Sequence, residues 1–184
     1  QLDKIGGMLA QALYLFALCW LLAQVEIEIE GARGWAEGLP TWRWDHPFLL
    51  KLTNGKPVTG YHFYLTLFLI GMFHLPLAFT GYSNAVEARI LSLYLLTTVT
   101  WDFQWFLWNP AWGLKRFLTE RIWWFPSKLL GFPREYYLGV AGSALATFLL
   151  DPQALGQWLR LALWLATASV LSAAAAQLKR APSR

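Results

Sequence analysis

Five long apolar stretches alternate with polar segments along the 184 residues of the chain. A transmembrane helix needs about 20 mostly apolar residues, and the stretches approach or reach this length at 8–25, 61–80, 89–108, 136–150 and 156–178. The main polar segments, 26–60 and 111–135, contain the glycines, prolines and charges that are typical of loops. The pattern predicts an all-α fold: one membrane domain, 1–184, built as a polytopic helical bundle of about five transmembrane helices.

Local signals refine these expectations. Pro76 lacks an amide hydrogen, so the second span should be kinked. Asp151 followed by Pro152 is typical of a helix start. Asn54-Gly55 predicts a small hairpin within the first loop. The first apolar stretch has no small-residue cleavage site after it, so we interpret it as a retained helix.

Composition supports a membrane protein. Hydrophobic residues make up 57% of the chain and charged residues only 14%, whereas a soluble domain carries roughly 25% charged residues. The twelve Trp residues suit the membrane–water interface. With Cys19 as the single cysteine, no intrachain disulfide can form. We therefore predict membrane lipids as partners, and no nucleic acid despite the net charge of +4.

The distribution of Lys and Arg predicts the orientation. The two main loops and the C-terminal segment hold twelve of the fifteen cations, and Lys4, Arg89 and Arg160 fall on the other side. The positive-inside rule assigns the cation-rich side to the cytoplasm. We expect a multi-pass protein of a prokaryotic inner membrane, with its N-terminus outside and its C-terminus in the cytoplasm.

The segment 111–135 is both basic and aromatic, which predicts an interfacial helix in the headgroup region. Its candidate interfacial or lipid-binding residues are Trp123, Trp124, Lys115, Arg116 and Arg121. They could bind an anionic headgroup, but ordinary anchoring at the interface needs no specific ligand.

Small residues predict where helices pack closely. Gly139 and Ser143 share a face of the fourth span, and Ala162 and Ala166 share a face of the fifth. Small residues at this spacing let helix backbones approach in lipid. We expect these two spans to form an antiparallel hairpin; docking of another protein is the alternative.

Ionisable residues within spans are costly and mark candidate functional sites. Asp102, His62, Glu26 and Glu30 are candidates for a cytoplasm-facing metal or proton site, and His74 is a deeper candidate. Carboxylates with an imidazole would suit zinc, iron or manganese as a divalent cofactor. In the simpler interpretation, the glutamates are solvated at a helix end and Asp102 pairs with a Trp N–H, Gln104 or an Arg.

Several short motifs resemble a family of small, uncharacterised prokaryotic membrane proteins, over roughly residues 25 to 140. The motifs are Glu28-Ile29-Glu30-Gly31, Gly34-Trp35-Ala36, Leu39-Pro40-Thr41-Trp42-Arg43, Lys56-Pro57-Val58-Thr59-Gly60-Tyr61-His62, Trp101-Asp102-Phe103-Gln104-Trp105-Phe106, Asn109-Pro110, Gly113-Leu114-Lys115-Arg116-Phe117 and Ile122-Trp123-Trp124. In the family a histidine follows the last motif, whereas this chain has Phe125 there. The resemblance implies a membrane topology and candidate residues, but no reaction.

Three functions are consistent with these features. The first is a non-catalytic accessory or structural subunit that packs against a larger membrane protein complex. The second is a metal-dependent membrane enzyme that acts on a lipid or isoprenoid, with the metal held by Asp102, His62, Glu26 and Glu30. The third is a small proton-linked permease that uses Asp102 and His74. The sequence leaves the choice between enzyme and non-enzyme open.

Overall fold

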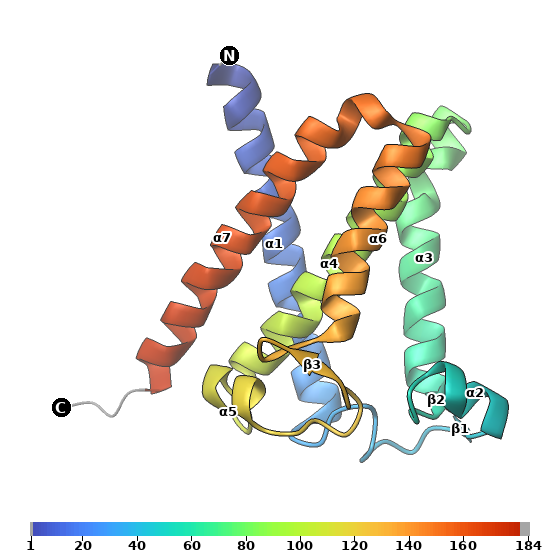
Figure 1. Cartoon of the computed structure of the whole chain (residues 1–184), viewed down its shortest axis with the longest axis vertical. Coiled ribbons are helices and arrows are strands. Elements are labelled where there is room, and N and C mark those ends of the chain that lie inside the picture. Colours follow the sequence, from blue (N-terminus) through green and yellow to red (C-terminus); the bar gives the residue numbers. More distant parts are fainter. Residues whose placement is uncertain (1, 181–184) are drawn as a thin grey trace.

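The chain folds into five long helices connected at one end by short turns and at the other by two structured loops (Figure 1). The structure is a computed structural model that describes the backbone of residues 2–180 and the side chains of residues 6–180. The long helices are α1 (Leu2–Glu30), α3 (Gly60–Thr80), α4 (Asn84–Trp108), α6 (Arg134–Leu150) and α7 (Leu155–Arg180). In Figure 1, α1, α4 and α7 run in one direction and α3 and α6 in the other. Segments 31–59 and 109–133 and the end of α7 therefore share one end of the molecule, which we call the loop end.

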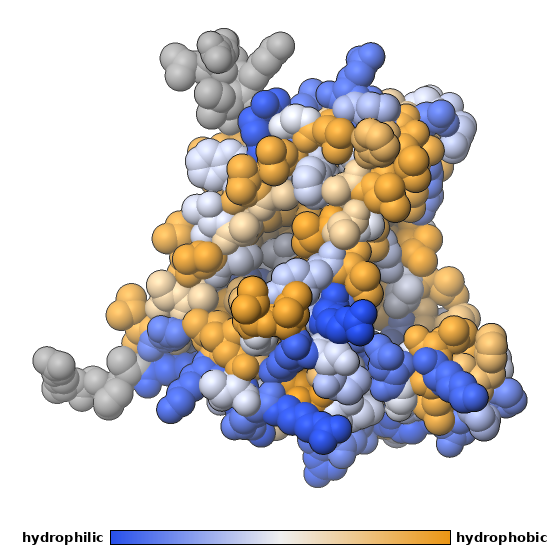
Figure 2. Space-filling view, in the orientation of Figure 1, coloured by the Kyte–Doolittle hydropathy of each residue, from blue (hydrophilic) through white to orange (hydrophobic). Residues whose placement is uncertain are grey.

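The helices confirm the all-α prediction. Among the residues described, three segments are long and apolar enough to cross a membrane: Gly6–Glu30, Gly60–Thr80 and Pro152–Arg180. Figure 2 shows apolar side chains over much of the helical surface and hydrophilic ones gathered over the loop end. α1 continues past the predicted boundary at 25, so Glu26 and Glu30 belong to a helix and not to the predicted loop.

Helix α4 lies at the centre of the fold and packs against α1, α6 and α7. Buried residues occur along its length from Ala88 to Leu107, and two of its polar side chains bond to a neighbouring helix. Ser172 of α7 donates a hydrogen bond to Gln104 Oε1 at 2.6 Å and accepts one from Trp108 Nε1 at 2.9 Å. Arg180 donates to the carbonyl oxygen of Leu107 at 3.1 Å, so the ends of α7 and α4 meet at the loop end.

Helix α6 packs against α4, which differs from the predicted hairpin of the last two spans. A Cβ on Gly139 would lie 2.6 Å from Val99 Cγ2 of α4, and Ser143 donates to the carbonyl oxygen of Ser92 at 3.0 Å. The short 3₁₀ turn Pro152–Ala154 directs α7 away from α6, toward α1 (Figure 1). Ala162 is half-buried near α1 and α4, and Ala166 is exposed.

The first loop contains two short strands and a helix rather than a hairpin centred on Asn54-Gly55. Strands β1 (Arg43–Trp44) and β2 (Val58–Thr59) pair in antiparallel fashion on either side of α2 (Pro47–Leu52). Asn54 and Gly55 have positive φ and form the turn that ends α2. The loop therefore closes on itself and delivers Thr59 directly to the start of α3.

The second loop is not the predicted interfacial helix. It contains a short helix, α5 (Leu114–Thr119), and a hairpin formed by β3 (Lys128–Leu129) and β4 (Phe132–Pro133). Trp124 is only 4% exposed because it packs among Trp105, Phe106 and Trp112. Trp124 is therefore packed inside the protein, whereas Trp123 is 44% exposed. The assignment of the two residues to the interface stays a prediction.

The basic residues of this loop differ in their surroundings. Lys115 and Arg121 are exposed. Arg116 pairs with Glu120 at 2.6 Å and lies over the ring of Trp112, 4.3 Å from its centroid. Their assignment as lipid-binding residues stays a prediction.

Helix α3 is the least buried of the long helices. Among its residues only Gly60 is buried, and large apolar side chains are exposed along it, including Phe63, Tyr64, Phe68 and Phe79. Its packing partner is α4. Pro76, where the sequence predicts a kink, lies within this helix, which continues to Thr80.

Candidate metal centre

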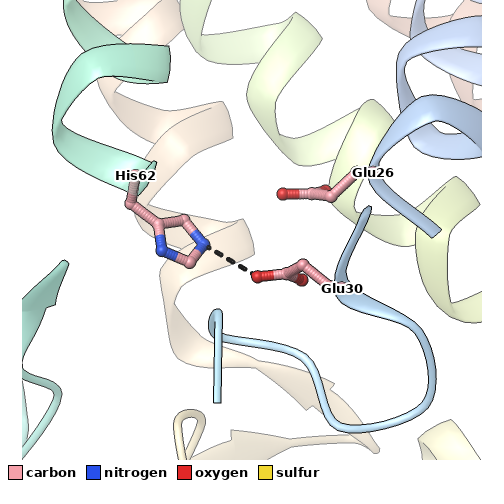
Figure 3. Close-up of side chains that lie close together, drawn as sticks. All are labelled: Glu26, Glu30 and His62. Atoms are coloured by element: carbon pink, nitrogen blue, oxygen red, sulfur yellow. Dashed lines mark ion pairs between the residues drawn. The ribbon is translucent and has the colours of Figure 1, made fainter. Parts of the chain in front are cut away.

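Three side chains with metal-binding atoms converge near the loop end, where α1 ends and α3 begins (Figure 3). Glu26 and Glu30 come from the last turns of α1, and His62 comes from the first turn of α3. One ligand atom from each residue lies within 4.8 Å of the others. Figure 3 shows both carboxylates pointing across the gap toward the imidazole. All three residues belong to the set predicted from the sequence.

Both glutamates are buried. Residues four apart share a helix face, and packing of α1 against α4 turns this face inward, leaving Glu26 6% and Glu30 9% exposed. The interpretation that they are solvated at a helix end is therefore wrong. Burying a carboxylate is costly unless a cation or hydrogen bonds compensate. Within the described side chains, no Lys or Arg forms an ion pair with either one.

His62 is held in an orientation that suits metal binding. Thr59 is fully buried at the N-cap of α3; its Oγ1 accepts the His62 backbone N–H at 3.2 Å and lies 2.8 Å from His62 Nδ1. The other ring nitrogen, Nε2, lies 3.5 Å from Glu30 Oε1. When Nδ1–H donates to Thr59, the Nε2 lone pair faces the carboxylates. A second residue that fixes the ring in this way is a usual feature of histidine metal ligands.

The loop after α1 folds back over the site. Trp35 and Ala36 both have positive φ, 48° and 51°, a conformation that non-glycine residues rarely adopt. It lets the Ala36 N–H donate to Glu30 Oε1 at 2.5 Å and stacks the Trp35 ring on His62 with centroids 4.2 Å apart. Backbone strain of this kind concentrates at functional sites and needs support from its surroundings. Arg43 provides such support by donating to the Ala36 carbonyl oxygen.

The three side chains line a cavity of about 260 Å³. Its walls come from α1, α3, α4, α6 and both loops, and it contains Asp102 as the sequence predicted. Tyr136 donates a hydrogen bond to Asp102 Oδ2. The hydrogen-bond partner of Asp102 is thus a tyrosine of α6. The simpler interpretation predicted a Trp N–H, Gln104 or an Arg instead. Glu135 lines the cavity as well, so four carboxylates face one space.

Two indole groups of this cavity lack a partner. Trp101 Nε1 and Trp105 Nε1 are buried and, within the described residues, neither makes a hydrogen bond. Buried N–H groups are rarely left unpaired, because the lost hydrogen bond to water costs about 1 to 3 kcal/mol. Both residues line the cavity. Their indole nitrogens have almost no accessible surface, however, so they do not reach the open space of the cavity.

Lys56 lies against two aromatic rings of the cavity wall. Its Nζ is 4.8 Å from the ring centroid of Trp35 and 4.9 Å from that of Phe125, and both rings line the cavity. Burial lowers the pKa of the Lys56 ammonium below its usual value, while the charges of Glu135 and Asp102 act in the opposite direction.

His74 lies outside this centre. Its Nε2 is 3.3 Å from Glu87 Oε1 of α4, and its Nδ1 is 2.8 Å from the Ile70 carbonyl oxygen within α3. The cavity is lined by Asp102 but not by His74. The structure therefore brings together four of the five predicted residues and separates the fifth.

Sequence reasoning missed the supporting residues Trp35, Thr59, Glu135 and Tyr136. One signal was present: Thr59 precedes a helical stretch as a typical N-cap and stands three residues before His62. Trp35 resembles any interfacial aromatic residue, so its stacking could not be anticipated. Glu135 and Tyr136 lie at the start of α6, far along the chain from the other residues.

The comparisons with known proteins provide no further guidance. No family model matches the sequence, and no similar curated protein or solved structure was found. The resemblance to small prokaryotic membrane proteins stays a prediction. Functional inference therefore rests on the site itself.

Proposed function

We propose that the chain is a polytopic membrane enzyme that uses a divalent metal ion bound by Glu26, Glu30 and His62. In this proposal the five long helices cross a prokaryotic inner membrane with the loop end in the cytoplasm. Alternating helix directions and the many Lys and Arg residues of the loop-end segments support this orientation.

The observation that carries the proposal is the convergence of two buried carboxylates and one oriented imidazole in a cavity. Zinc, manganese and iron accept oxygen and nitrogen ligands at about 2.1 Å, which places ligand atoms about 3 to 4 Å apart. The three atoms lie within 4.8 Å of one another, so small side-chain rotations would complete the site. A divalent ion would also neutralise the buried carboxylates.

The number of ligands favours catalysis over a purely structural role. Three protein ligands leave positions for water and substrate, as in catalytic zinc sites. A metal ion in such a site polarises an ester or phosphoester oxygen and activates water. Asp102, positioned by Tyr136 in the same cavity, would accept the proton of that water. The proposed substrate is a lipid or isoprenoid, because the surrounding helices expose apolar side chains.

Metal titration of two glutamine variants on one helix tests the metal site. Glu30→Gln removes a buried ligand, whereas Glu28→Gln changes an exposed residue two positions away. Isothermal titration of Zn²⁺ or Mn²⁺ into chelator-treated protein should show one tight site in wild type and Glu28→Gln and none in Glu30→Gln. Equal binding by all three proteins, or binding by none, would overturn the proposal.

The accessory-subunit hypothesis stays a second candidate, and the exposed aromatic face of α3 is the surface that it would use. Co-purification from mild detergent tests it. A stoichiometric membrane partner would favour the subunit hypothesis, whereas a monodisperse single chain would count against it. The permease hypothesis would use Asp102 and His74, which lie in different surroundings.

A further inference from the structure

Lys56 adds a positive charge beside the proposed metal ligands. The segment between α2 and α3 is short, so Lys56 lies only six residues before His62 in the first turn of α3. The ring of Trp35 contacts both of them: the Lys56 ammonium lies over it, and the imidazole of His62 stacks on it. The Lys56 ammonium and the proposed ligand His62 therefore contact the same indole ring.

The Lys56 ammonium has no close anionic partner. Within the described side chains, no carboxylate oxygen lies within 4.0 Å of Nζ. Its close contacts are the faces of Trp35 and Phe125, which stabilise a cation only modestly. A half-buried ammonium without a counter-ion is available to an anionic ligand.

The charges around the cavity set the order of binding. Four carboxylates line it, Glu26, Glu30, Asp102 and Glu135. They would repel an anion, so an anionic ligand requires the metal ion to be bound first.

We propose that the ligand of this cavity is a lipid phosphate, whose oxygens bridge the metal ion and the Lys56 ammonium. This inference rests on the proposed metal site. Phosphate oxygens are hard anionic ligands that suit divalent metals and lysine alike. A lipid is favoured over free phosphate because aromatic and apolar side chains, among them Val99, Trp124 and Phe125, form much of the wall. The exposed apolar side chains of neighbouring α3 would meet the acyl chains.

The test uses the full chain in phosphatidylcholine nanodiscs, loaded with Mn²⁺. The probes are dihexanoyl phosphatidic acid and inorganic phosphate, each followed by ³¹P relaxation and by titration calorimetry. Bound Mn²⁺ should shorten the ³¹P relaxation of the lipid phosphate in wild type. Lys56→Met should weaken its binding by about tenfold or more, and Lys51→Met, which changes an exposed lysine of α2, should leave it unchanged.

The outcomes separate the two proposals. Normal Mn²⁺ binding without lipid phosphate binding, or equal binding by Lys56→Met and wild type, overturns the lipid-phosphate inference alone. Equal affinity for inorganic phosphate overturns the assignment to a lipid. Absence of Mn²⁺ binding overturns the proposed metal site, and lipid phosphate that then still binds in a Lys56-dependent manner contradicts the requirement for a metal.

Discussion

Helix α3 carries two histidines, one toward each of its ends. Each histidine lies close to a glutamate of a neighbouring helix. At the loop end, His62 Nε2 lies 3.5 Å from Glu30; near the other end, His74 Nε2 lies 3.3 Å from Glu87. The two distances are nearly equal. The surroundings differ: the Glu30 side chain is 4% exposed and the Glu87 side chain 18%, and His74 is 33% exposed against 20% for His62.

The support around each pair differs even more. His62 has a second carboxylate in reach, a buried threonine on its other nitrogen and a strained loop stacked on its ring. The other ring nitrogen of His74, Nδ1, lies within hydrogen-bond distance of a carbonyl oxygen of its own helix. A histidine–glutamate contact is thus compatible with either role. The additional carboxylate, threonine and loop around His62 are what distinguish a candidate site from a simple polar contact between two helices.

The largest expected difference between the two pairs is in metal affinity. His62→Asn removes a ligand and should lower the affinity for Zn²⁺ or Mn²⁺ by more than about 100-fold, beyond the effect usual for an outer-shell residue. His74→Asn should leave the affinity within about twofold of wild type, because His74 lies outside the cavity. Titration calorimetry measures both. Equal losses in the two variants would contradict the distinction.

A smaller effect is expected from the residue that orients His62. Thr59→Val keeps the size of the side chain but removes the oxygen that contacts Nδ1 and caps α3. We expect metal affinity to fall by about 10- to 100-fold and stability by about 1 kcal/mol. Thr59→Ser should restore both. If Thr59→Val binds metal like wild type, the hydroxyl does not orient the ring.

The loop over His62 offers a matched pair of glycines. Gly34 has φ +64°, and a Cβ there would lie 2.8 Å from the Trp124 ring, whereas Gly38 has nothing within 4 Å. Gly34→Ala should therefore destabilise the protein by about 1 to 3 kcal/mol and weaken metal binding, and Gly38→Ala should change neither. Thermal unfolding in detergent, with and without Zn²⁺, measures both effects. Equal behaviour of the two variants would show that the loop does not support the site.

The smallest effect is expected at the outer pair. Glu87→Gln removes the charge that faces His74, and polar contacts between membrane helices contribute about 0.6 kcal/mol on average. We expect a stability loss of this size and unchanged metal binding, as measured by detergent or denaturant unfolding. A loss of metal binding in this variant would show that the two ends of α3 are coupled.

The main helices and most of the candidate residues could be predicted from the sequence. Apolar stretches of membrane-spanning length are a strong signal, and ionisable residues within or beside them are rare enough to stand out. Glu26, Glu30, His62 and Asp102 were identified on this basis. The end of α1 was placed too early, because the alternation of Glu and Ile after Val25 lowers the local hydrophobicity while the helix continues.

Long-range packing could not be predicted in the same way. Small residues such as Gly139 and Ser143 show that a helix packs closely, but not against which neighbour, and α6 packs mainly on α4 and less on α7. Trp124 could not be distinguished from an interfacial aromatic residue, since its burial depends on Phe106 of α4 and on the way its own loop folds back to bring Trp112 against it. The supporting role of Trp35 depends on positive φ at two non-glycine residues, which no local pattern indicates.

The most direct test of the central claim is the X-ray absorption spectrum of the protein loaded with Co²⁺. Co²⁺ accepts the same nitrogen and oxygen ligands, and a bound imidazole adds outer-shell scattering that carboxylates lack. We expect one imidazole with carboxylate oxygens in wild type, and loss of the imidazole signal in His62→Asn. A spectrum without imidazole in wild type, or an imidazole signal that persists in His62→Asn, would contradict a metal centre formed by Glu26, Glu30 and His62.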